Sequence, residues 1–430
     1  MLNCGAAIAS VPPCKTQSIQ CLPLCVFRVM GYADAQEGAF SRTAFRSTEK
    51  AYKRYTHVSS AKSRNQHSRR AQVPATDVSK VLDFKKLGED GEYNIEGVSR
   101  VEGSGWPVYT IDKHPGFYFI PEALNKAEQL YWATECLTTF PQPPNRTNHN
   151  AMYGPIANLW AAFQENKILV EVASGKQERD LISNSAETRS VDEKISDSIE
   201  SVRAEVSDDI TVVEKNRFHD NGITTSGGDG GNSWEFRDCS TDFLKTSSAK
   251  TVSSETLVRK LRWATVGIQF DWSKRAYNEA LPFQEIPPKL ADLARRLAKP
   301  AMENEDFKAE AAIVNFYGPD DMLGGHVDDM EADMSKPIVS ISLGCKAIFL
   351  LGGTTRDEPP AAMFVRSGDV VLMAGPARHC FHGVPRIFSE AKESELPDFT
   401  SMSDVDGIQP RSIVKYLESS RINVNIRQVH

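Results

Sequence analysis

Two histidines and an aspartate in the C-terminal half of the chain could together hold a metal ion. The segment GGHVDDM places His326 and Asp328 two residues apart, so both side chains point to one face if the segment is extended. An imidazole and a carboxylate presented in this way are two of the three protein ligands that hold non-haem Fe(II) and leave coordination positions open. The third ligand must be a histidine from another strand.

The segment HCFHGVPRI offers two candidates for the third ligand, His379 and His382. They are three positions apart and therefore face opposite sides of a strand. The Gly-Val run that follows His382 favours this residue, so we predict an iron site made of His326, Asp328 and His382. A His-x-Asp pair alone is weak support, because surface residues often form one by chance. The histidine 56 positions downstream makes the prediction much stronger.

The chain ends with a segment in which polar and apolar side chains alternate, RINVNIR (421–427). This period of two predicts a strand with Ile422, Val424 and Ile426 on its apolar face. Its polar face carries Arg421, Asn423, Asn425 and Arg427. Because that face holds two arginines and no acidic residue, it meets either water or a group with negative charge.

Short β-rich segments separated by Gly, Pro and Asp turns follow one another from residue 311 to the C-terminus. In chain order they are AAIVNFY (311–317), KPIVSISLG (336–344), KAIFLLGG (346–353), AMFVR and DVVLMAG around a turn at 367–369, FHGVPRIF (381–388) and RINVNIR. Upstream, we expect a strand over 116–120, a helix that begins at Pro121 and another helix after Pro287 and Pro288. The sequence therefore predicts a mainly β fold, a double-stranded β-helix or jelly roll, with N-terminal helices packed on it.

Charge is distributed unevenly along the chain and suggests its organisation. The net charge is −7, yet residues 1–75 hold 11 basic and 3 acidic side chains, whereas residues 172–255 hold 10 basic and 17 acidic ones. The acidic segment is also polar and glycine-rich, so it cannot bury enough apolar surface to offset its ordering entropy. We predict a disordered basic leader (1–75) with at most a short helix over 42–55, an α-rich extension (76–171), an acidic disordered insertion (172–255) and a C-terminal domain that carries the site (256–430).

The first 33 residues contain no acidic side chain and several Ser, Thr and Ala residues, a composition typical of organelle transit peptides. An unstructured leader, or translation that starts at Met30, is the alternative. We therefore expect the nucleus or cytoplasm, or a mitochondrion or chloroplast if this segment directs import.

The sequence contains no run of 18 apolar residues, so it predicts no membrane span. The cysteines lack CxxC spacing, which favours a reducing compartment.

The segment from Asn315 to Ile387, together with RINVNIR, resembles the catalytic core of the AlkB family of Fe(II)/2-oxoglutarate dioxygenases. The motifs HVDD, SKPIVSISLG, AIFLLGG, RDEPPAAMF and RINVNIRQV most resemble the eukaryotic AlkB homologue 1 subgroup. The likeness is strong over 256–430, weak over 115–171, and absent from the first 75 residues and the acidic insertion. It implies an enzyme that requires Fe(II), with 2-oxoglutarate and O2 as co-substrates.

The resemblance also implies roles for individual residues. The iron ligands would be His326, Asp328 and His382, and the contacts to 2-oxoglutarate would be made by Asn315, Tyr317, Arg421, Asn423 and Arg427. The chemistry agrees, because a buried dianion needs fixed cations and the planar fork of arginine matches a carboxylate with two parallel hydrogen bonds. A solvent-facing strand is the alternative for the two arginines, and Asn425 has no assigned role.

Members of the family that act on methylated bases hold a flipped base between side chains, so we expect an aromatic residue upstream of the iron motif. The segment LRWATVGIQFDW supplies Trp263, Phe270 and Trp272. Trp263 resembles the base-stacking tryptophan of the family, and Phe270 is a second candidate. Ordinary core packing is the alternative for each. An acidic residue that reads the base in bacterial members is replaced here by Met330, so bacterial repair specificity should not be transferred.

These features predict an enzyme that removes or hydroxylates methyl groups on nucleic-acid bases, in tRNA such as N1-methyladenosine or in methylated DNA, with succinate, CO2 and formaldehyde as products. We expect a monomer with no membrane association. The segments KLRWATV and SKRAY offer Lys260, Arg262, Lys274 and Arg275, but the core has no long basic run, so nucleic-acid affinity should be moderate and salt-sensitive. A dioxygenase that modifies a protein side chain and a non-catalytic nucleic-acid-binding module are the alternatives.

Overall fold

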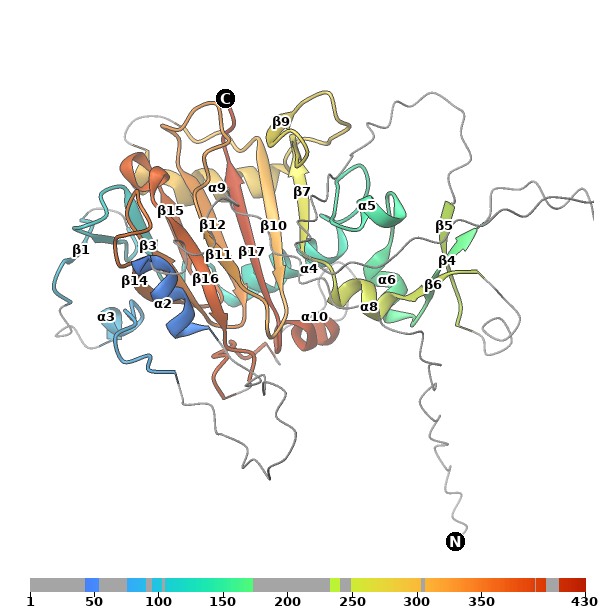
Figure 1. The fold of residues 1–430 in the computed structure, drawn as a ribbon, viewed down its shortest axis with the longest axis horizontal. Helices are drawn as coiled ribbons and strands as arrows, with labels where there is room; N and C mark the ends of the chain where they lie inside the picture. Colours follow the sequence, from blue (N-terminus) through green and yellow to red (C-terminus); the bar gives the residue numbers. More distant parts are fainter. Residues whose placement is uncertain are drawn as a thin grey trace, which may run out of the picture.

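The computed structural model describes residues 43–53, 76–89, 95–102, 105–172, 233–239, 249–302, 306–390, 392–399 and 410–430. Two antiparallel sheets form its centre (Figure 1). The large sheet contains β1 (Val98–Arg100), β2 (Tyr109–Ile111), β3 (Phe117–Ile120), β7 (Trp263–Gly267), β10 (Ala311–Tyr317), β12 (Ile338–Gly344), β15 (Val370–Met373) and β17 (Arg421–Arg427). The small sheet contains β11 (Leu323–His326), β13 (Ala347–Leu351), β14 (Ala361–Val365) and β16 (His382–Ile387).

The order of the strands is that of a double-stranded β-helix. Among the described residues the large sheet runs β1-β2-β3-β15-β12-β17-β10-β7 and the small sheet runs β11-β16-β13-β14. Aromatic and aliphatic side chains fill the space between the sheets, and the rings of Phe117 (β3) and Phe349 (β13) stack there with centroids 6.4 Å apart. The predicted mainly β jelly roll is confirmed, and the seven β-rich segments predicted from residue 311 onward coincide with β10, β12, β13, β14, β15, β16 and β17.

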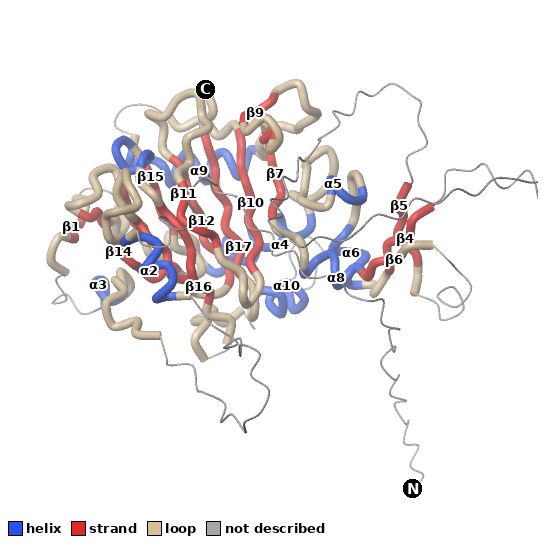
Figure 2. The backbone as a smooth tube through the Cα atoms, viewed as in Figure 1, coloured by secondary structure: helices blue, strands red, loops and turns tan. Residues whose placement is uncertain are grey.

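Helices cover the outer face of the large sheet (Figure 2). Ile422, Val424 and Ile426 of β17 point to this face and share one core with α4 (Lys126–Thr138), α9 (Pro288–Ala298) and α10 (Pro410–Leu417). The inner face of the same strand therefore carries the polar residues, as the alternation predicted. Strand β17 lies between β12 and β10, so its polar face lies inside the sheet and not at an edge.

The helix that the sequence placed at Pro121 begins five residues later. Asn125 caps α4 through a capping box with Glu128, which satisfies the free N–H groups of the first turn. The residues before it are held in a loop, because Glu122 N donates to Asp369 Oδ1 and Leu124 N donates to Gly368 O. The second predicted helix is α9, with Pro288 at its first position.

The boundaries predicted after residues 75, 171 and 255 do not separate folded from unfolded chain. Helix α2 (Ala44–Tyr52) lies inside the predicted leader, and the side chain of Phe45 is fully buried. The predicted α-rich extension contributes β1, β2 and β3 to the large sheet. Both ends of the predicted insertion are folded, because β4 (Ile168–Val172) pairs with β5 (Ser233–Arg237) and β6 (Thr251–Ser253). The candidate transit peptide and residues 173–232 lie outside the described residues.

The remaining elements are short. They are α3 (Lys86–Glu89), α5 (Asn150–Tyr153), α6 (Leu159–Gln164), α8 (Ser254–Arg259), the hairpin strands β8 (Gln269–Asp271) and β9 (Ala276–Asn278), and the 3-10 helices η1 (Lys299–Ala301) and η2 (Gly375–His379). Within the described ranges, no helix has the length and apolar character needed to cross a membrane.

Candidate metal and co-substrate site

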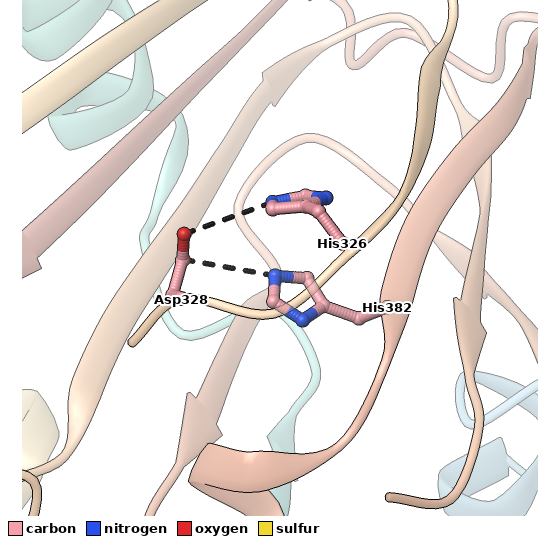
Figure 3. Close-up of side chains that lie close together, drawn as sticks. All are labelled: His326, Asp328 and His382. Carbon is pink, nitrogen blue, oxygen red and sulfur yellow. Dashed lines mark ion pairs between the residues drawn. The ribbon is translucent and has the colours of Figure 1, made fainter. Parts of the chain in front are cut away.

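The three residues predicted to bind iron come together at one end of the small sheet (Figure 3). His326 is the last residue of β11 and pairs directly with His382, the first residue of β16. Asp328 follows β11 by two residues and faces both rings, with its carboxylate oxygens 3.7 Å from each Nε2 atom. One potential ligand atom from each of the three residues lies within 4.8 Å of the others, which fits a facial triad around one metal ion.

Backbone carbonyl groups orient both histidine rings. His326 Nδ1 lies 3.0 Å from Gly324 O, and His382 Nδ1 lies 3.3 Å from Cys380 O. A carbonyl oxygen can only accept, so each Nδ1 carries the proton and each Nε2 keeps its lone pair for a metal. The alternative ligand His379 is exposed on η2. The structure therefore places His382, and not His379, beside the other two ligands.

The charge states of His326 and Asp328 suit metal binding at neutral pH. Burial and the adjacent ring of His382 lower the pKa of His326 to about 4, so its imidazole is neutral. Burial disfavours the charged form of Asp328, but Arg427 and the two histidines outweigh burial and hold the pKa of this carboxyl well below its usual range. Neutral imidazoles and an ionised carboxylate are the forms that bind a divalent cation.

Helix α2 packs against the strand that carries His326. β11 is an edge strand, and Glu49 Oε1 accepts a hydrogen bond from Gly325 N at 3.0 Å, which satisfies an N–H that the sheet leaves open. The ring of Phe45 lies on Gly325 and Gly352, where it occupies the space that side chains would need. The part of the predicted leader that the structure describes thus supports the metal site.

The contact between α2 and β11 predicts a difference between two adjacent glycines. A Cβ atom at Gly325 would lie 2.3 Å from Phe45 Cε1, whereas one at Gly324 would lie 3.4 Å from Glu49 Oε1. We expect Gly325→Ala to lower the free energy of unfolding by about 1–3 kcal/mol, the usual cost of overpacking. Gly324→Ala is the matched control and should stay within about 0.5 kcal/mol of wild type in the same denaturant titration. Equal effects of the two changes would contradict the packing described.

Beside the triad, the inner face of the large sheet forms a polar floor. The register places Trp263, Asn315, Asn423 and Ser342 opposite one another in a row across β7, β10, β17 and β12. The next row contains Tyr317 and Arg421. Directly opposed residues on one face lie about 4.5–5.5 Å apart, so the side chains of these rows are neighbours.

Arg421 and Tyr317 carry donors that are ready for an anion. The Arg421 side chain is 2% exposed; its Nη2 donates to Ser342 Oγ at 3.0 Å, while Nε and Nη1 lack a hydrogen-bond partner among the described residues. The buried hydroxyl of Tyr317 also lacks one. Buried polar groups without partners are costly, and a carboxylate placed between these two side chains would satisfy them. These residues therefore fit the predicted 2-oxoglutarate site.

Arg427, the other arginine predicted to bind 2-oxoglutarate, already contacts three side chains of the protein. Its Nη2 donates to Asp328 Oδ2 at 2.7 Å, and its Nε lies 2.9 Å from Glu331 Oε1. Its Nη1 donates to the Tyr277 hydroxyl at 3.3 Å. Burial disfavours the charge, but Asp328, Tyr277 and Glu331 outweigh it and raise the pKa of Arg427. The two arginines thus differ among the described residues, because both terminal nitrogens of Arg427 are bonded and only its Nε lacks a hydrogen bond, whereas Arg421 has an unbonded terminal nitrogen as well as an unbonded Nε.

The asparagines of β17 form a short relay. Asn425 Nδ2 donates to Asn423 Oδ1 at 2.9 Å, and Asn423 Nδ2 donates to Ser340 Oγ at 2.9 Å and Ile341 O at 3.0 Å. Asn425, which had no role in the sequence, therefore fixes the amide orientation of Asn423. Ser340 and Ser342 were missed, although their period-two spacing in PIVSISLG could have indicated them.

Four aromatic rings line the edge of the large sheet beyond Asn315. The ring centroids of Trp263 and Trp272 lie 5.1 Å apart. The ring of Phe270 packs edge-on against Trp272 and Tyr277, with centroid distances of 4.8 Å and 5.2 Å. Phe270 is buried, whereas Trp272 is 42% exposed and Trp263 is half-buried. Phe270 therefore packs beneath the other rings without a free face, whereas Trp263 and Trp272 are partly accessible to a ligand.

The segment before α5 fixes Trp263 in place. Thr147 forms an antiparallel bridge with Ala264, and the Asn148 side chain accepts from Arg262 N at 2.8 Å and donates to Lys260 O at 2.9 Å. The Arg262 guanidinium in turn forms an ion pair with Asp321 in the loop between β10 and β11. Sequence reasoning missed this support, since nothing in the pattern links residue 148 to residue 263.

Comparisons with known proteins agree with this geometry. Residues 237–427 match the 2OG-Fe(II) oxygenase superfamily. The "DNA N(6)-methyladenine demethylase ALKBH1A" of Arabidopsis thaliana is 45% identical over 399 residues, which cover 90% of this chain and 96% of that protein. The "Nucleic acid dioxygenase ALKBH1" of Homo sapiens is 29% identical, with 84% of this chain and 76% of that protein covered.

Two further matches are more limited. The "tRNA demethylase abh1" of Schizosaccharomyces pombe is 38% identical over 181 residues, which cover 42% of this chain and 57% of that protein. A solved structure, "The structure of OsALKBH1", is 27% identical over 39% of this chain and 78% of that chain, with a TM-score of 0.30.

The fold and the triad define an Fe(II)- and 2-oxoglutarate-dependent dioxygenase. Within that class the chain belongs to the AlkB family, in the AlkB homologue 1 subgroup. The residues described fit the cofactor set of the class, since the triad supplies two imidazole nitrogens and a carboxylate and Arg421 offers unpaired donors.

Proposed function

We propose that this protein oxidatively removes methyl groups from nucleic-acid bases, in tRNA such as N1-methyladenosine or in methylated DNA. The observation that carries the proposal is the pair Trp263 and Trp272, an aromatic corner at the edge of the sheet row that contains Asn315 and Asn423. A base taken out of its stack needs such aromatic faces to replace its lost neighbours. Two relatives are named as demethylases of DNA and of tRNA, which supports the same substrate class.

The bound iron, with 2-oxoglutarate and O2, would supply the oxidation of a methyl C–H bond, after which a hydroxylated N-methyl group loses formaldehyde. The chain's own contribution is placement. Arg421 and Tyr317 would bind the co-substrate. His326, Asp328 and His382 would hold the metal, and Trp263 and Trp272 would receive the base.

Phosphate contacts near this corner are few. Lys260 and Lys274 are exposed, whereas Arg262 is paired with Asp321. Non-specific affinity should therefore be moderate and should fall as salt is raised, because each neutralised phosphate releases counterions. The monomeric state and the cellular location expected from the sequence remain proposals. Import of fluorescent fusions with and without residues 1–29 would test the location.

The direct test supplies purified protein with Fe(II), ascorbate and 2-oxoglutarate, and offers matched oligonucleotides of tRNA and DNA with and without one methylated base. We expect succinate and formaldehyde in equal amounts, and loss of the methyl group by mass spectrometry of the nucleosides. If no methylated nucleic acid is consumed while a protein substrate is hydroxylated, the proposal fails and the protein-directed alternative replaces it.

The aromatic corner gives a prediction of its own. Base stacking on an aromatic side chain is worth about 1–3 kcal/mol, so Trp272→Ala should raise the KM for the nucleic acid by about 5- to 150-fold. Trp272→Phe keeps an aromatic face and should recover most of this loss. The slow turnover of 2-oxoglutarate without nucleic acid should not change in either variant. Unaltered KM in Trp272→Ala would show that the base binds elsewhere.

A further inference from the structure

A buried network of four charged side chains lies behind the metal site. Arg378 Nη2 donates to Glu331 Oε2 at 2.6 Å, and the other oxygen of Glu331 lies 2.9 Å from Arg427 Nε. Arg427 then donates to the metal-binding carboxylate of Asp328. The side chains of Glu331 and Arg378 are 2% and 1% exposed, respectively. Glu331 therefore contacts two arginines directly without belonging to the metal triad.

Glu331 determines how Arg427 faces Asp328. The Nε–H of Arg427 makes no hydrogen bond among the described residues, but the ion pair with Glu331 and the hydrogen bond from Nη1 to the Tyr277 hydroxyl together hold the planar guanidinium and so set the direction of Nη2. Tyr277 is itself held, because its hydroxyl donates to Glu331 Oε1 at 3.1 Å. One carboxylate thus anchors both groups that orient Arg427.

The balance of charge gives Glu331 a second effect. Arg427 and Arg378 carry two positive charges, and Asp328 and Glu331 carry two negative charges, so the buried network is neutral. Without the Glu331 charge, Asp328 would be the only carboxylate in contact with Arg427, and a carboxylate drawn toward a guanidinium is a poorer metal ligand. Arg378 would at the same time lose its only acidic partner among the described residues.

We propose that Glu331 is a positioning residue for the metal centre, which holds Arg427 at the angle that leaves Asp328 available to the ion. Arg378 fixes Glu331 from behind, since it also donates to Lys336 O at 2.7 Å and Asp328 O at 3.2 Å. This role is independent of the substrate and so does not depend on the proposed function. A purely structural salt bridge between η2 and the loop after β11 is the alternative.

The test compares four proteins: wild type, Glu331→Gln, Arg378→Met and the double variant. Each full-length protein is titrated with Mn(II), whose free ion is counted by electron paramagnetic resonance, and each unfolding midpoint is measured without metal. Glutamine keeps the size of Glu331 but not its charge, and methionine replaces the Arg378 stem beside Met334. The double variant removes one charge of each sign and so keeps the network neutral.

We expect Glu331→Gln to weaken Mn(II) binding by about 10- to 100-fold, as for other groups that orient metal ligands, and to lower the unfolding midpoint. Arg378→Met alone should weaken Mn(II) binding less than Glu331→Gln does, because Glu331 still contacts Arg427 directly. The double variant should recover the midpoint but bind Mn(II) as weakly as Glu331→Gln, because Arg427 still lacks its anchor. Wild-type Mn(II) affinity in Glu331→Gln, or recovery of both quantities in the double variant, would overturn the proposal.

Discussion

Replacing His326 by alanine should abolish turnover, with a fall in kcat/KM of more than about a hundredfold. Loss of a residue that merely orients a metal ligand costs about 10–100-fold, and His326 is itself a ligand candidate, so its loss should cost more. Its Nε2 faces Asp328, and its Nδ1 is held by Gly324 O. The measurement is succinate release with saturating Fe(II) and 2-oxoglutarate, together with Mn(II) affinity.

His379→Ala is the control for this experiment. It removes the other histidine of the HCFH segment, which is exposed on η2. Turnover by His379→Ala should equal that of wild type, and His382→Ala should behave like His326→Ala. Activity that survives in His326→Ala, or is lost in His379→Ala, would mean that the metal lies elsewhere.

Short-range patterns predicted much of the fold and the site. Strand β17 alternates without interruption, so Ile422, Val424 and Ile426 could be assigned to the helix-covered face and Arg421 to the inner face from the sequence alone. The spacing of His326 and Asp328 worked for the same reason, since a two-residue step in extended chain preserves direction. Both inferences depend only on neighbours in sequence.

The errors came from contacts between distant residues. The start of α4 moved to Lys126 because Gly368 and Asp369 hold the preceding loop. A short helix was expected where α2 lies, but its packing on the core was not, because the burial of Phe45 depends on the space at Gly325 and Gly352 far along the chain. In the same way, no local pattern distinguishes an arginine with free donors from one that is paired across the site.

Arg421 has buried donors without partners among the described residues, so replacing it should give the second large effect, on the KM for 2-oxoglutarate. The hydrogen bonds that its fork would make to a carboxylate are worth about 1.5–3 kcal/mol, so Arg421→Lys should raise the KM for 2-oxoglutarate by about 10- to 100-fold. Lysine keeps the charge but cannot form two parallel bonds. Tyr317→Phe removes one neutral donor and should raise the same KM by about 2- to 10-fold.

Arg421 should lower the stability of the folded protein when 2-oxoglutarate is absent. Burial lowers the pKa of Arg421, and two of its donor atoms have no hydrogen-bond partner in the described part of the chain, so the charge is held at a loss until an anion arrives. Arg421→Met should then unfold at the same or a higher temperature than wild type without ligand, and should gain nothing from added 2-oxoglutarate. Wild type should gain stability with ligand concentration, as mass action requires. A lower midpoint in Arg421→Met, with 2-oxoglutarate still stabilising it, would show that this arginine supports the fold and not the co-substrate.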